Sequence, residues 1–158
     1  MPARDELEAA IQKQALDRGA GLALLIGLAR RRLKQAVGRH VQPFGLSPQQ
    51  FWCLITLGKH PGLSLRELAL LVWTDAPTAS RVIQTLSRRR LVRALGHPMD
   101  RRRNRLMLTQ RGSVLARRLE RIAEKVRALV REPLSRAEQQ TLRRLLLAVI
   151  VNLDGVTP

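Results

Sequence analysis

The chain has 158 residues and a formal net charge of +17 at pH 7, so it has the length of one domain and is strongly basic. Its only cysteine, Cys53, excludes an internal disulfide, and no set of residues has the spacing of a zinc site. The first ten residues include acidic side chains, unlike a secretory signal, and the apolar runs are shorter than the ~20 residues that cross a bilayer. We expect one soluble cytoplasmic domain, residues 1–158, with no cofactor or metal.

The sequence lacks the residue patterns that most enzymes need. It contains no carboxylate cluster, no serine with histidine and acid partners and no glycine-rich phosphate loop, and its only imidazoles are His40, His60 and His97. An enzyme acting on nucleic acid is therefore the least supported function. A high positive charge is typical of proteins that bind nucleic acid.

The first predicted element is a helix from about Asp17 to Val41. Apolar side chains recur along it at three- and four-residue spacing, namely Leu22, Leu25, Ile26, Ala29, Leu33 and Val37. This pattern indicates a helix with one apolar side.

Two short amphipathic helices are predicted next. Ser47 with Gln50, and Ser64 with Glu67, have the spacing of capping boxes, in which each side chain binds the other residue's backbone amide. They predict helices from Pro48 to about His60 and from Leu65 to about Val72. The expected buried positions are Phe51, Leu54, Ile55 and Gly58 in the first helix, and Leu65, Leu68, Ala69 and Val72 in the second.

A third helix begins after a cap at Thr74 or Asp75. It is expected to bury Ala79, Val82, Ile83 and Leu86, which leaves a polar face on its other side. We predict that this face reads DNA bases through Pro77, Thr78, Ser80, Arg81, Gln84, Thr85 and Arg88. A merely solvated face is the alternative, but such faces usually mix charge signs and this one does not.

Residues 91–112 predict a strand, a basic loop and a second strand. Val92 and Ala94 alternate with other side chains, as do Leu106 and Leu108, and glycine and proline lie between the two segments. The expected wing residues are Asp100, Arg101, Arg102, Arg103 and Arg105. Arginines this close together repel one another unless water or a polyanion screens them, and we infer that the polyanion is DNA.

Two apolar helices are predicted after the hairpin. One carries a heptad seam of Leu115, Leu119, Ile122, Val126 and Leu129 and ends before Pro133. The other begins at Ser135, capped with Glu138, and carries Leu142, Leu145, Leu146, Val149, Ile150 and Leu153. We favour a homodimer that covers this surface, and packing within one subunit is the alternative.

Together these elements predict a mainly α fold with a small β-wing. A winged helix-turn-helix region at 45–112 would lie between dimerisation helices at 5–42 and 113–155. Phosphate contacts are expected from Ser64, Arg88, Arg89, Arg93 and Arg103. The predicted function is sequence-specific regulation. A non-specific architectural DNA coat is the alternative, although it would not need the hydroxyl and amide groups of the third helix.

Residues 45–112 resemble the central region of MarR-family transcriptional regulators. The similarity includes Asp100 with Arg102, the pair Leu108 and Thr109, and Gly112. It implies an obligate dimer that binds a palindromic operator, usually as a repressor, and releases it when a small aromatic or phenolic acid binds or a cysteine is oxidised. It also implies that Asp100 braces the wing and that Arg102 enters the minor groove.

The sequence departs from the family pattern at two points. Arg90 stands where the family commonly has glycine, and the chain has no tyrosine. The expected effector contacts are therefore His40, Phe44 and Trp52, and each of these could instead be an ordinary helix-end or core residue. For Cys53 we favour a buried structural thiol, with a redox sensor as the alternative.

Overall fold

The computed structural model describes residues 9–10, 13, 21–97 and 100–155, and the side chains of residues 97–103 lie outside the described part. The elements are α2 (Leu22–Val41), the 3-10 helix η1 (Gln42–Phe44), α3 (Pro48–Lys59), α4 (Leu65–Leu71), α5 (Ala76–Arg88), β1 (Val92–His97), β2 (Asp100–Leu108), α6 (Gln110–Arg131) and α7 (Arg136–Asp154). This order confirms the mainly helical fold with a two-stranded wing. The predicted start of the first helix at Asp17 falls outside the described residues.

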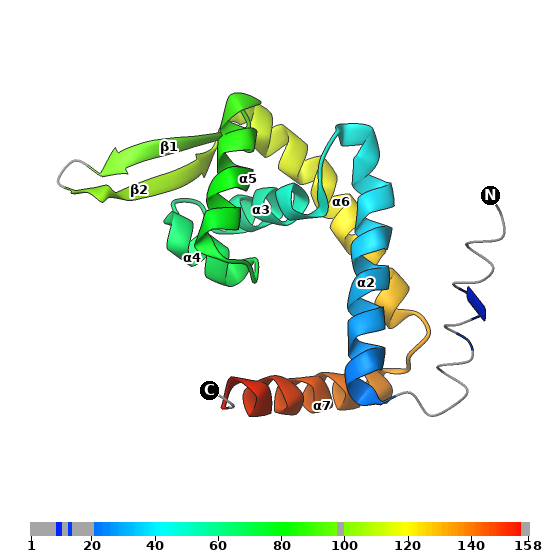
Figure 1. Cartoon of the computed structure of the whole chain (residues 1–158). Helices are drawn as coiled ribbons and strands as arrows, with labels where there is room; N and C mark the ends of the chain where they lie inside the picture. Colours follow the sequence, from blue (N-terminus) through cyan, green and yellow to red (C-terminus); the bar gives the residue numbers. More distant parts are fainter. Residues whose placement is uncertain (1–8, 11–12, 14–20, 98–99, 156–158) are drawn as a thin grey trace.

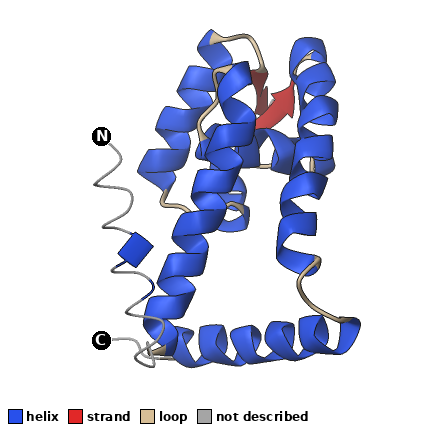
Figure 2. Ribbon diagram, turned by 90° about the vertical axis from the view of Figure 1, so that its right-hand side faces the viewer, coloured by secondary structure: helices blue, strands red, loops and turns tan. Residues whose placement is uncertain are grey.

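The elements gather into two regions. Helices α3, α4 and α5 lie together at one end, and the β1–β2 hairpin projects from them (Figure 1). The long helices α2 and α6 pack against each other. The chain continues from α6 into α7, which lies across the opposite end of the molecule (Figure 2). None of the described helices is both long and apolar enough to span a bilayer.

Side-chain caps fix where helices α3 to α7 begin. All three predicted capping boxes are present, at Ser47, Ser64 and Ser135. At α3, for example, the Gln50 amide donates to Ser47 Oγ at 3.2 Å while the Ser47 amide donates to Gln50 Oε1 at 3.0 Å. Each box satisfies amide groups that the first helical turn leaves without an intrahelical acceptor.

Helix α3 occupies the centre of the core. Phe51 and Leu54 are fully buried, as predicted, but the expected buried position at Gly58 is wrong because that residue is exposed. Cys53 and Leu57 are buried in addition. The reason is that α3 packs against α2, α4, α5, α6 and β2, so it is covered on more than the single side that an amphipathic pattern describes.

The wing is an antiparallel hairpin with a longer second strand than expected. The alternation predicted the two strands, and in the structure Val92 pairs with Leu108 and Ala94 with Leu106. The Leu106 amide also donates to the Leu63 carbonyl at 2.8 Å, which ties the hairpin to the segment before α4. The prediction of a basic loop is wrong for residues 100–103. They belong to β2, because the strand pairing continues to His97 and Asp100.

The start of α6 is locked to the start of β1. Thr109 Oγ1 accepts the Gly112 amide at 3.0 Å and donates to the Arg90 carbonyl at 2.7 Å. A Cβ atom at Gly112 would lie 2.0 Å from the Leu91 carbonyl oxygen, so only glycine fits there.

The flanking helices leave much apolar surface uncovered. Helix α7 has no buried residue, and α6 buries Leu119 and Val126 of its predicted seam but leaves Leu129 55% exposed. Other exposed apolar side chains of α2 and α7 include Leu22, Leu24, Leu33, Leu142, Leu145, Leu147, Val151 and Leu153.

Candidate nucleic-acid interface

The N-terminus of α5 is held in place by Asp75. Its Oδ1 accepts the Thr78 amide at 2.7 Å, and the Thr78 hydroxyl donates to its Oδ2 at 2.9 Å. These hydrogen bonds, with the backbone bond the strongest cause, hold the pKa of the Asp75 carboxyl below its ordinary value. The residue is therefore a charged cap at neutral pH, which orients the first turn of the helix.

One side of α5 is polar and open to solvent. Ala79, Ile83 and Leu86 are buried, and Val82 is only half-buried. The predicted reading residues divide into two groups, with Pro77, Arg81, Gln84, Thr85 and Arg88 exposed and Thr78 and Ser80 half-buried. The structure thus brings all of these residues onto one helix, but Ser80 lies in a cleft that β2 residues Asn104 and Leu106 also line.

Hydrogen bonds within α5 connect several of the predicted reading side chains. Arg81 Nη2 donates to the Thr78 hydroxyl at 3.3 Å, and Thr78 in turn donates to Asp75. The Thr85 hydroxyl donates to the Arg81 carbonyl at 3.0 Å. The proton of each hydroxyl is therefore engaged inside the helix, and each oxygen would face a base mainly as an acceptor.

The described part of the wing positions two of the predicted basic residues. Arg93 lies exposed on β1 opposite Met107. Arg105 pairs with Leu95 in mid-strand, and its Nη1 donates to the Gly62 carbonyl at 3.3 Å, so it braces the base of the wing rather than its tip. The side chains of Asp100, Arg101, Arg102 and Arg103 lie outside the described part.

Arg89 has a contact that the sequence pattern did not indicate. Its Nη1 donates to the Gly45 carbonyl at 2.7 Å and its Nη2 to the Phe44 carbonyl at 2.9 Å. The guanidinium therefore connects the end of α5 to the turn after η1, where Gly45 has a positive φ of 60°. Arg88, one residue earlier, is exposed, and Ser64 caps α4 through its Oγ.

Arg90, which stands where the family commonly has glycine before the first wing strand, adopts a backbone conformation that glycine favours. It has a φ of 56° in the left-handed region, where glycine is favoured, and its amide donates to the Ser87 carbonyl at 2.9 Å. The turn is thus retained with a residue that occupies this conformation at some conformational cost.

Comparisons with known proteins agree with this geometry. The family model described as MarR family matches residues 44–103. The transcriptional regulator PA3341 is 30% identical with a TM-score of 0.77, and the match covers 85% of this chain and 99% of that one. The chain belongs to the MarR family. Members are winged-helix transcriptional regulators that bind DNA, so this chain is a DNA-binding regulator and not an enzyme.

Two further solved structures share the fold at lower identity. MepR of S. aureus in complex with DNA has a TM-score of 0.80 at 22% identity, over 84% of this chain and 98% of that one. The reduced form of MarR from E. coli has a TM-score of 0.67 at 21% identity, over 82% and 96%. No curated protein matches the chain significantly.

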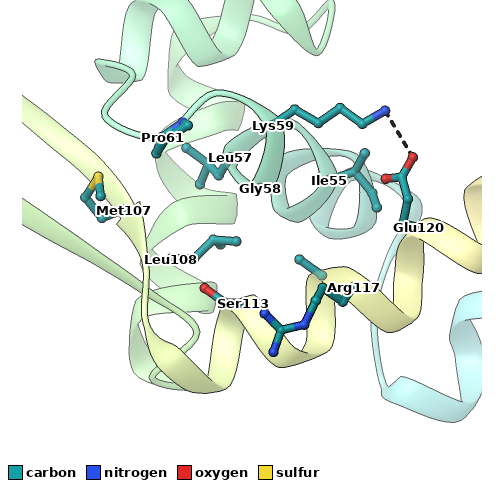
Figure 3. Close-up of a pocket in the computed structure, with 11 residues that line it drawn as sticks. Ile55, Leu57, Gly58, Lys59, Pro61, Met107, Leu108, Ser113, Arg117 and Glu120 are labelled. Carbon is teal, nitrogen blue, oxygen red and sulfur yellow. Dashed lines mark ion pairs between the residues drawn. The ribbon is translucent and has the colours of Figure 1, made fainter.

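The structure does not gather the predicted effector residues of this MarR-family chain around one cavity. His40, Phe44 and Trp52 are half-buried, and His40 Nδ1 lies 2.8 Å from the Ala36 carbonyl. A cavity of about 510 Å³ lies instead between α3, the end of β2 and α6 (Figure 3). Its lining includes Ile55, Leu57, Lys59, Pro61, Met107, Leu108, Ser113, Ala116, Arg117 and Glu120. No sequence pattern indicated this cavity, because its walls come from three separated segments.

Cys53 has the surroundings of a structural residue. It is 1% exposed, and burial raises the pKa of its thiol to about 12. Only a minute fraction would be thiolate at neutral pH, and thiolate is the form that reacts with oxidants. Its environment therefore argues against the redox-sensor alternative.

Proposed function

We propose that this MarR-family regulator acts in the cytoplasm as a homodimeric repressor, which binds a palindromic operator and leaves it when a small aromatic or phenolic acid binds. The observation that carries operator reading is the exposed face of α5. Arg81 can grip guanine through two hydrogen bonds and Gln84 can pair with adenine. Apart from the cap Asp75, α5 carries no carboxylate that would repel phosphates.

The proposed dimer rests on the uncovered apolar surface of the flanking helices. A groove of about 530 Å³ between α6 and α7 is lined by Val130, Leu134, Leu142, Leu146 and Ile150 together with polar residues. Exposed apolar patches of this kind mark protein interfaces, and a two-fold axis would present two α5 helices to successive turns of DNA. The flanking segments 5–42 and 113–155 would supply this interface.

The proposed phosphate and minor-groove contacts extend the reading helix on both sides. Arg88, Arg93 and Ser64 are accessible to a DNA backbone, and Arg103 joins them from the sequence prediction. Arg102, with Asp100 bracing it, would enter the minor groove. We expect Arg102→Ala to weaken binding most at narrow, A·T-rich flanks, which binding assays on duplexes with A·T- and G·C-rich flanks would measure. Equal weakening on both duplexes would contradict insertion.

The cavity between α3, β2 and α6 is the better supported place for an effector. Leu57, Leu108 and Ala116 give it apolar walls, and Arg117 supplies a cation for a carboxylate. Lys59 Nζ and Glu120 Oε1 form an ion pair of 3.0 Å beside it (Figure 3). A bound acid would compete with Glu120 for the Lys59 ammonium and so alter how α3 sits on α6.

The experiment that tests the regulator is selection from random DNA by the purified protein. We expect an inverted repeat, bound in preference to unrelated DNA by about a thousandfold or more at physiological salt. Equal competition by unrelated DNA would instead establish the architectural coat.

The effector step is tested by titrating small aromatic acids into the complex with the selected duplex. Ser113→Phe should fill the cavity and abolish release while leaving DNA binding intact. The matched variant Phe44→Leu/Trp52→Phe should still release. The opposite pattern would place the effector at His40, Phe44 and Trp52.

A further inference from the structure

Helix α6 carries a line of cations away from the core. We call it the α6 basic stripe, and it consists of Arg111, Arg118, Arg121 and Lys125, all exposed. Spacings of three, four and seven residues place them on one side of the helix, whereas Leu119, Ala123 and Val126 face the core. The stripe spans 14 residue steps, or about 21 Å at the helical rise.

The carboxylates of α6 do not neutralise this stripe. Glu120 pairs with Lys59 at 3.0 Å and with Arg127 at 3.1 Å, and Glu124 pairs with Arg127 at 3.0 Å and with Arg131. These are the only acidic residues between Gln110 and Arg131. No stripe residue has a hydrogen bond or an ion pair with another part of the chain that the structure describes.

This segregation of charge is informative. An arginine-rich composition alone would not send both carboxylates to one side of α6 and leave four cations together on another. Like charges at this spacing destabilise an isolated helix and favour a polyanion that screens them. Duplex DNA carries about one negative charge per 1.7 Å of its axis, so a line of cations matches its backbone.

The stripe is separate from the reading head. Helix α3 packs against both α5 and α6, and the stripe lies on the side of α6 turned away from the core. In Figure 1, α5 crosses in front of α3, while α6 leaves the base of the wing and passes behind α2. A DNA segment read by α5 and the wing would therefore leave much of the stripe uncovered.

We propose that the α6 basic stripe is a second DNA-binding surface, which holds the phosphate backbone of another duplex segment without regard to sequence. It would let one regulator bound at its operator capture distant or neighbouring DNA. This activity is additional to operator reading, since it needs no base contact.

The test is a two-duplex capture assay with matched variants. Protein is bound to an immobilised selected duplex, and retention of a labelled duplex of unrelated sequence is measured against salt. R118Q/R121Q/K125Q removes three stripe cations, and the control R30Q/K34Q/R144Q removes three exposed cations scattered over α2 and α7. Circular dichroism and native mass establish that both variants keep their fold and assembly.

We expect the stripe variant to capture at most about one tenth as much of the labelled duplex as the native chain does, while it continues to bind the immobilised duplex. Its logarithmic salt slope should fall by about 0.9 for each phosphate that the removed cations no longer neutralise. The control should capture like the native chain. Equal weakening in both variants, or unchanged capture by the stripe variant, would overturn the proposal.

Competition by polyglutamate separates DNA from an acidic protein partner. If polyglutamate competes as strongly as a duplex of equal charge, the proposal is overturned and the stripe binds acidic protein instead. Failure of operator selection would leave capture measurable, because the selected duplex can be replaced by any immobilised duplex that the protein binds. The two proposals therefore fail separately.

Discussion

At the residue scale, Gly112 and Cys53 are two positions where the surrounding atoms restrict which side chain fits. Gly112 touches a backbone carbonyl, which cannot move without disturbing both β1 and α6. Cys53 is sealed in the core. The family resemblance singled out Gly112, and the sequence favoured a buried thiol at Cys53. The carbonyl contact could not be predicted, because it involves Leu91, which is 21 residues away and belongs to no recognised motif.

Gly112→Ala should destabilise the fold by about 3 kcal/mol, because its Cβ would overlap the Leu91 carbonyl and force the backbone to shift. Urea denaturation would measure the reduced free energy of unfolding. Gly58→Ala is the matched control, since its Cβ would meet Ala116 at an ordinary 3.5 Å and alanine favours the helix. A neutral Gly112→Ala would mean that the α6 start is not locked as described.

The raised pKa of the buried Cys53 thiol should make the free energy of unfolding depend on pH. The pKa of about 12 in the folded chain lies above the ordinary value of 9.0, so the unfolded chain releases the proton first as pH rises. Stability is therefore full below about pH 9 and falls above it, by at most about 1.4 kcal/mol per unit. The slope between about pH 9 and 10.5, measured by urea denaturation, should be shallower in Cys53→Ala. Identical slopes would contradict the raised pKa.

Arg81→Ala should cost about 1 to 3 kcal/mol of operator affinity and relax base preference at one position in each half-site. The reason is that the guanidinium would otherwise grip one base through two hydrogen bonds, and a repeated selection with the variant would show the change. Arg144→Ala, on α7, should leave the selected sequence unchanged. An unaltered preference in Arg81→Ala would refute the assignment.

At the element scale, the helix starts were the most predictable feature. Capping boxes and Asp75 fixed them locally, because a cap involves residues only three apart. The two wing strands also followed from alternation, although their register did not. What the sequence could not show were contacts between distant segments, such as Arg105 with Gly62, Arg89 with the η1 turn, and the cavity formed by three elements.

Arg88 and Arg89 should behave differently although they are neighbours at the end of α5. Arg89→Ala removes two hydrogen bonds to backbone carbonyls and should lower stability by about 1 to 2 kcal/mol. Arg88→Ala should leave stability unchanged and reduce the salt slope of DNA binding by about 0.9. Thermal unfolding and salt titrations on both variants decide this. A lower salt slope in Arg89→Ala, without a stability change, would contradict this structural role and support the prediction that Arg89 contacts phosphate.

At the scale of the whole molecule, the distribution of charge and apolar surface organises the proposals. Cations are spread over α2, α5, the wing and α6, while uncovered apolar side chains gather on α2 and α7. The composition predicted both excesses. It could not assign them to surfaces, because that depends on how the helices pack.

The dimer proposal predicts the effect of polar substitutions on α7. Leu146→Gln/Ile150→Gln should give a monomer with much weaker operator binding, because both side chains line the groove between α6 and α7. Native mass and operator titration would measure this. The control Thr141→Ala lies on the same helix but outside the lining of this groove, and it should remain dimeric. A monomeric native chain would refute the proposal outright.

Since α7 buries none of its residues, a lone subunit gains almost nothing by keeping that helix folded. Its amide protons should exchange early in dilute protein, and proteases should clip there before anywhere else in the described chain. Under the dimer proposal, a newly synthesised subunit that does not dimerise would be degraded quickly. The amount of regulator in a cell would then depend on how often two subunits meet as well as on the rate of expression.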